Sequence, residues 1–167
     1  MHSGKKSKLK NKLFKKLVFM LCGLLVLLIL TVFYIEYQTE KELEKEEFKL
    51  MHIQSLNKQI VLTHEKIVKY SHTNAPEEEI IFYVQSLQHM FQIFHQSAVK
   101  QNFVNTRWFS DVHNNYWSYS AFVFRNNFSE IFMVKAAKHK SELLDMEDSL
   151  QNKVNQLKEK IANYWWK

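Results

Sequence analysis

Residues 17–35 read LVFMLCGLLVLLILTVFYI, and this uncharged stretch decides how the rest of the chain is organised. An α-helix rises about 1.5 Å per residue, so a helix of this length is roughly 28 Å long and matches the hydrocarbon thickness of a bilayer. The stretch therefore predicts a single transmembrane helix. A cleaved signal peptide is the alternative, but its apolar region is shorter, about 7–15 residues, and ends at a small-residue cleavage site that residues 31–37 lack.

Lysine residues flank the apolar stretch unequally. Seven lysines and no acidic residue precede it, whereas only three lysines follow it closely, at Lys41, Lys45 and Lys49. Lysine on the cytoplasmic side of a span sets its orientation, and acidic residues contribute little. We therefore expect a basic cytoplasmic tail at residues 1–16, a transmembrane helix at 17–35 and an exported domain at 36–167.

The composition is rich in Lys, Asn, Ile and Phe, and its only arginines are Arg107 and Arg125. Such usage is typical of an AT-rich genome, bacterial or mitochondrial. The expected location is the inner (cytoplasmic) membrane of a bacterium, with the mitochondrial inner membrane as the alternative. Basic and amphipathic aromatic side chains favour the membrane interface. The residues expected there are Lys15, Lys16, Tyr34, Tyr37, Trp165 and Trp166.

The net charge of +6 is unevenly distributed along the chain. The first 35 residues hold seven lysines and no acidic residue, and the remainder holds 16 basic and 17 acidic residues. The exported domain therefore lacks the excess positive charge that a phosphate backbone attracts, and nucleic acid is not an expected partner. The single cysteine, Cys22, lies within the apolar stretch, so no intrachain disulfide can form.

Two glycines and one proline in 167 residues indicate long helices with few turns. Residues 36–72 should continue the transmembrane helix, with a solvated charged face over 36–49. Further along, apolar residues alternate at steps of three and four, a spacing typical of a helix face that packs against partner helices. These residues are Ile53, Leu56, Ile60, Thr63, Ile67 and Tyr70.

Three more helices are predicted after a turn at residues 71–79, which contains Pro76. The second helix runs from about residue 76 to 104, and the last from about 128 to the end of the chain. Between them, residues 105–127 should form a short third helix, with a short strand as the alternative. The fold class expected is all-α, an up-down bundle of four helices in the exported domain, or of three if 105–127 is a loop.

The common catalytic motifs are absent from the sequence. It has no Gly-rich phosphate loop, no nucleophile elbow and no Cys/His pair. The eight histidines lack the spacing of zinc or di-iron ligands, and His139 falls on the apolar face of the last helix, where a hydrogen-bonded core histidine is expected. We therefore expect no catalytic residue, no metal site and no cofactor.

The aromatic segment 105–127 is the strongest candidate for an interaction site. Its residues Arg107, Trp108, Trp117 and Arg125 are of the types enriched in interface hot spots, although such rings also fill helical cores or line ligand pockets. The leading hypothesis is a non-catalytic, membrane-anchored scaffold or docking subunit. Its expected partners are membrane lipids and other membrane or envelope proteins, with a second copy of the chain as an alternative. The alternative function is a sensory or small-ligand-binding bundle that signals through a partner.

Overall fold

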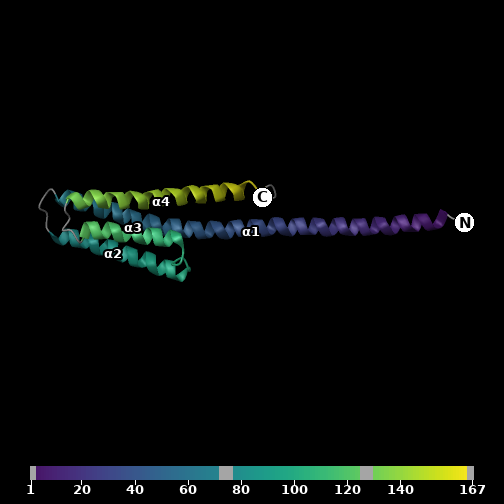
Figure 1. The fold of residues 1–167 in the computed structure, drawn as a ribbon, viewed down its shortest axis with the longest axis horizontal. Coiled ribbons are helices and arrows are strands. Elements are labelled where there is room, and N and C mark those ends of the chain that lie inside the picture. The colour runs from purple at the N-terminus through teal and green to yellow at the C-terminus, as the bar shows by residue number, and fades with distance from the viewer. Residues whose placement is uncertain (1–2, 72–76, 125–129, 165–167) are drawn as a thin grey trace. The chain divides into compact units, whose positions relative to one another are not determined.

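The computed structural model describes the backbone of residues 3–71, 77–124 and 130–164, and its regular elements in these ranges are all α-helices (Figure 1). They are α1 (Ser3–Ser71), α2 (Glu77–Lys100), α3 (Arg107–Phe124) and α4 (Glu130–Ala162). The all-α prediction is confirmed, and within the predicted segment 105–127 the described residues Arg107–Phe124 form a helix rather than a strand. The chain divides into two compact units, a first unit of Met1–Leu43 with Leu157–Lys167 and a second unit of Glu44–Gln156.

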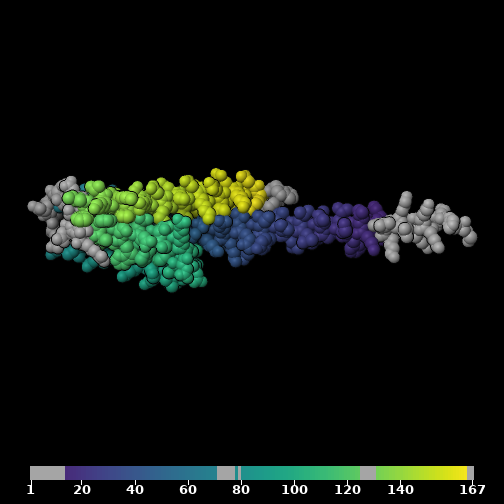
Figure 2. Space-filling view, in the orientation of Figure 1, coloured from purple at the N-terminus to yellow at the C-terminus, as the bar shows by residue number. Residues whose placement is uncertain are grey.

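The first unit contains the apolar stretch of α1. Among the described residues this is the one helix long and apolar enough to cross a membrane, with a mean hydropathy of 2.9 over its most apolar 18 residues. None of that window is buried, and Figure 2 colours the described part of this segment purple to indigo. The helical backbone of α1 already begins at Ser3, in the basic tail.

A hydrogen bond in the same unit joins the end of the chain to α1. The hydroxyl of Tyr164 donates to Oγ1 of Thr39 at 2.9 Å, and Thr39 in turn donates to the carbonyl oxygen of Ile35 at 2.8 Å. Thr39 is buried in this contact. The last described residue of the chain therefore lies one helical turn beyond Ile35, where the apolar stretch ends.

In the second unit, five of the six residues of α1 that follow the predicted spacing are buried, and the sixth, Tyr70, is half-buried. Ile53, Leu56, Ile60, Thr63 and Ile67 are all at most 1% exposed. Because these positions recur every three or four residues, they lie on one side of the helix. The predicted buried face of this helix is confirmed over these residues.

Helix α2 ends earlier than the apolar pattern suggests, at Lys100 rather than near residue 104. Asn102 adopts a left-handed conformation with φ of 57°, and its N–H donates to the carbonyl of Val99 at 3.1 Å. The N–H of Phe103 donates to the carbonyl of Ala98 at 2.8 Å, and the ring of Phe103 is buried. These two bonds form a Schellman motif, in which asparagine replaces the usual glycine and satisfies the last carbonyls of the helix.

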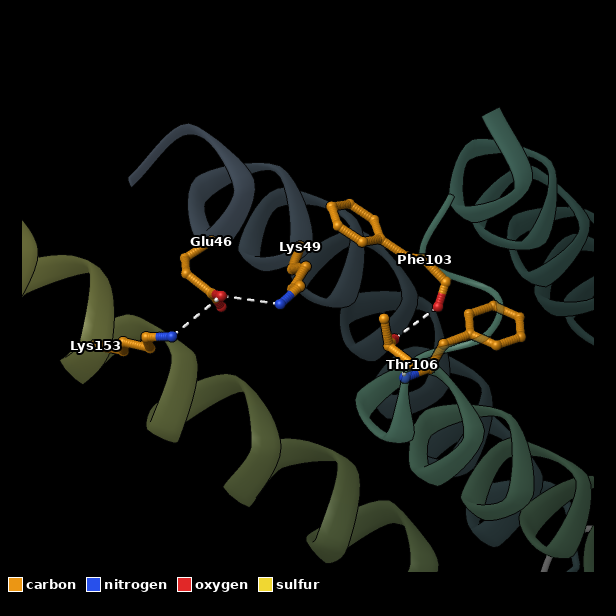
Figure 3. A network of polar contacts seen from close by, with 6 residues as sticks. Glu46, Lys49, Phe103, Thr106 and Lys153 are labelled. Carbon is orange, nitrogen blue, oxygen red and sulfur yellow. Dashed lines mark hydrogen bonds and ion pairs between the residues drawn. The ribbon is translucent and has the colours of Figure 1, made fainter. Parts of the chain in front are cut away.

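Helix α3 begins at a threonine cap. The side chain of Thr106 accepts a hydrogen bond from the N–H of Phe109 at 3.3 Å and donates to the carbonyl of Phe103 at 2.6 Å (Figure 3). A side-chain oxygen at this position satisfies an N–H that has no partner within the helix. The turn predicted at residues 71–79 falls largely outside the described residues.

Consecutive helices of the second unit contact one another, and α1 also contacts α4. Asn57 of α1 donates through Nδ2 to the carbonyl of Leu143 at 2.9 Å and to Oε2 of Glu147 at 2.8 Å, both on α4. Stacked rings join α2 to α3 and α3 to α4, and polar contacts join α1 to α2 and α3 to α4. These contacts are Thr63–Tyr83 between α1 and α2, and Asn115–His139 between α3 and α4.

Candidate functional site

Two stacked aromatic pairs join α2 to α3. The rings of Phe91 and Tyr116 lie 3.7 Å apart and almost parallel, and those of Phe94 and Phe109 lie 5.4 Å apart with an interplanar angle of 7°. All four residues are buried. Because the pairs recur about one to two helical turns apart on each helix, they hold α2 and α3 in a single register.

Trp117 lies beside the first pair and is 49% exposed. Its ring meets those of Phe91 and Tyr116 edge-on, at centroid distances of 6.3 and 5.8 Å. Its indole N–H donates to Nε2 of His113 one turn earlier, at 2.9 Å. The only polar atom of this large side chain is thus paired within α3, and one part of the ring system faces solvent.

Trp108 lies in a different environment from Trp117. Its ring packs edge-on against Phe94 at 5.7 Å, and Nζ of Lys49 lies over it, 5.6 Å from the centroid. Its Nε1 is buried without a hydrogen-bond partner. Nine residues separate the two tryptophans, which is about two and a half helical turns, so they lie on opposite sides of α3.

Arg107, one of the two arginines predicted for the interaction site, is not part of these aromatic contacts. Arg107 has a side chain 95% exposed and lies 3.8 Å from the carboxylate of Asp111, one turn along the same helix. Arg125 lies outside the described residues. Of the four predicted site residues, Trp108 therefore contributes mainly to packing, Trp117 and Arg107 are accessible, and the three described ones form no common cluster.

A cleft of about 370 Å³ opens between α2 and α3 beside Trp117. The described residues that line it are Gln88, Phe91 and Gln92 from α2, and Tyr116, Trp117, Ser120 and Phe124 from α3. Burial raises the pKa of Tyr116 to about 12, so its phenol is neutral at physiological pH. Sequence reasoning identified Trp117 but missed the two glutamines. The feature of the sequence that could have indicated these glutamines is their spacing, because they lie one helical turn apart on either side of Phe91.

A buried carboxylate forms a second polar site, between α1 and α4 (Figure 3). Oε1 of Glu46 accepts hydrogen bonds from Nζ of Lys49 at 2.9 Å and from Nζ of Lys153 at 3.2 Å. The Glu46 side chain is only 8% exposed, so the prediction of a solvated charged face over residues 36–49 is wrong at this residue. The pattern along α1 alone could not reveal Lys153, which lies 107 residues further along the chain and supplies the second charge.

Besides Nε1 of Trp108 and Oδ1 of Asn57, two buried polar side-chain atoms of the described residues have no hydrogen-bond partner. They are Nδ1 of His64 on α1 and the hydroxyl of Tyr119 on α3, and the two rings lie 5.9 Å apart. Burial, with the charge of Lys140 as a smaller cause, lowers the pKa of His64 to about 4. Burial likewise raises the pKa of Tyr119 well above its usual range, so both groups are neutral at physiological pH.

Within the described ranges, no group of three or more histidine, cysteine, aspartate or glutamate side chains is placed to hold a metal ion. His139 is half-buried, and its Nδ1 lies 3.0 Å from Oδ1 of Asn115 and 3.2 Å from Oε2 of Glu142. This is the hydrogen-bonded histidine expected on the inner face of the last helix.

The interface residues expected at the ends of the apolar stretch are exposed where the structure describes them. Lys15 and Lys16 precede the stretch, and Tyr34 and Tyr37 lie at or beyond its end. Trp165 and Trp166 lie outside the described residues. Comparison of the sequence with models of protein families, with curated proteins and with solved structures gave no match.

Proposed function

We propose that this protein is a single-pass membrane protein whose exported helical bundle docks to a larger membrane or envelope assembly without catalysing a reaction. The anchor is the apolar stretch of α1, none of whose most apolar window is buried within the chain. The lysine excess before this stretch favours a cytoplasmic N-terminus. The membrane is the inner membrane of a bacterium or, as the alternative, that of a mitochondrion.

The contacts in the second unit support an up-down arrangement of the four helices. Each helix contacts the next in sequence, and α1 contacts α4 through Asn57 and Leu143. In an up-down bundle of four helices, the last helix ends at the same end of the bundle at which the first helix begins. The hydrogen bond between Tyr164 and Thr39 agrees with that arrangement.

The observation that carries the docking proposal is an uncovered apolar surface at the beginning of α4. Ile131 and Val134 are 70% and 71% exposed, and they lie three residues apart on one face of the helix. Further along the same face, the exposed residues are polar, as at Ser141 and Asp145. A contiguous apolar patch that stays exposed on a folded domain is the kind of surface at which a partner protein docks.

Photo-crosslinking in intact membranes tests this proposal. A photoreactive amino acid at Val134 should give a discrete, ultraviolet-dependent adduct, and one at Ser141 should give none. The size of the adduct separates another protein from a second copy of the chain. Absence of an adduct at Val134, together with purification of a lone monomer in mild detergent, would refute the docking role.

A further inference from the structure

The cleft between α2 and α3 has rigid aromatic walls. The parallel rings of Phe91 and Tyr116 are in contact and buried, so neither can move aside without breaking the packing of the two helices. Trp117 stands edge-on to both rings, and its indole N–H is paired with His113. A half-exposed tryptophan held in this way presents a preformed flat surface, which lowers the entropy lost when another ring stacks on it.

The polar groups of the cleft are neutral amides and a hydroxyl. Gln88 and Gln92 are exposed and lie one turn apart on α2, and each amide can both donate and accept hydrogen bonds. The hydroxyl of Ser120 donates to the carbonyl of Trp117 at 3.0 Å, so it offers acceptor lone pairs to a ligand. None of the described lining residues carries a charge.

We propose that this cleft binds a small, planar heteroaromatic molecule without formal charge, which stacks against Trp117 and hydrogen-bonds to the amides of Gln88 and Gln92. The volume of about 370 Å³ accommodates one or two fused rings. A charged ligand would lose its hydration without gaining an opposite charge, so the cleft disfavours it. The site is separate from the apolar surface of α4 and does not depend on the docking role.

Fluorine NMR of the full chain in mild detergent, with 5-fluorotryptophan in place of tryptophan, tests the proposal. The resonance of Trp117 is assigned by its loss in Trp117→Phe. Caffeine, nicotinamide and indole are the neutral planar probes, and benzoate and benzylammonium are the charged ones. At least one neutral probe should shift the Trp117 resonance to saturation, whereas the charged probes should not.

A matched pair of variants on α2 separates a specific cleft from weak stacking on an exposed ring. Gln92→Ala should weaken binding of the neutral probe about fivefold, the usual effect of losing one hydrogen bond. Gln96→Ala removes an equally exposed glutamine one turn further along, outside the cleft, and should change the affinity less than about twofold. The proposal is overturned if no neutral probe saturates, if charged probes bind as well, or if the two variants behave alike.

Discussion

Leu27 and Leu56 lie on the same helix, yet Leu27 is 65% exposed and Leu56 is fully buried. Around Leu27 every residue of the helix is apolar or small, and none of the most apolar window is buried within the chain. Around Leu56 apolar residues return every three or four positions, and other helices of the second unit cover them. The same helix therefore uses leucine in two ways, to face lipid in the proposed span and to exclude water from a protein core.

The largest expected effect concerns the proposed span. In a Cys22→Ser background, Ser71→Cys should react with a membrane-impermeant thiol reagent in intact cells or spheroplasts, whereas Ser7→Cys should not. The reason is the lysine bias around residues 17–35, which favours export of residues 36–167. Labelling of Ser7→Cys alone would reverse the proposed orientation, and labelling of both in intact cells would show that the stretch does not span a membrane.

The buried half of α1 should respond strongly to truncation of one leucine. Leu56→Ala removes a fully buried side chain and should lower the free energy of unfolding by about 3 kcal/mol, through lost burial and the cavity left behind. Leu27→Ala is the matched control and should change it by less than about 0.5 kcal/mol. Chemical unfolding in mild detergent, followed by circular dichroism, measures both. Equal losses would mean that Leu27 is also covered in the folded protein.

A further change in the free energy of unfolding is expected from pH, through the buried residue His64 of α1. Its pKa is about 6.5 in the unfolded chain and about 4 in the folded protein, so the unfolded chain binds the proton more tightly. The free energy of unfolding should therefore be highest above pH 6.5 and fall by roughly 3 kcal/mol as the pH drops to about 4.

Chemical unfolding at about pH 7 and about pH 4, on either side of this titration, checks the expectation. His64→Leu should remove most of the difference, whereas His89→Leu, at an exposed position on α2, should leave it unchanged. If the His64 variant keeps the whole pH dependence, other groups cause it.

The local pattern of apolar residues was sufficient to predict the helices but not to predict where each helix ends. The spacing of Ile53, Leu56 and Ile60 predicted a buried face because helix geometry places such residues on one side of the chain. The end of α2 was not predicted, since the apolar pattern continues to Phe103 while Asn102 already turns the backbone. Asparagine is only one of several residues that adopt this conformation, and the composition of a segment does not show which one will do so.

Part of the candidate site could not be predicted from the sequence. The residue types of segment 105–127 pointed to Trp108 and Trp117 equally, but only packing against α1 and α2 distinguishes the ring beneath Lys49 from the ring beside the cleft. The glutamines on the other wall belong to α2, and their spacing places them on one side of that helix without showing which residue of α3 they face.

By itself, the sequence determined the apolar helix, the all-helical class and the faces that become buried, because these depend on spacing and composition along a single segment. Only the tertiary structure decided that Glu46 is enclosed by Lys49 and Lys153, that Asn57 reaches the backbone of α4, and that a cleft lies beside Trp117. These features depend on which residues of different helices face one another. That choice comes from packing the side chains of four helices at once, and no single segment contains the information for it.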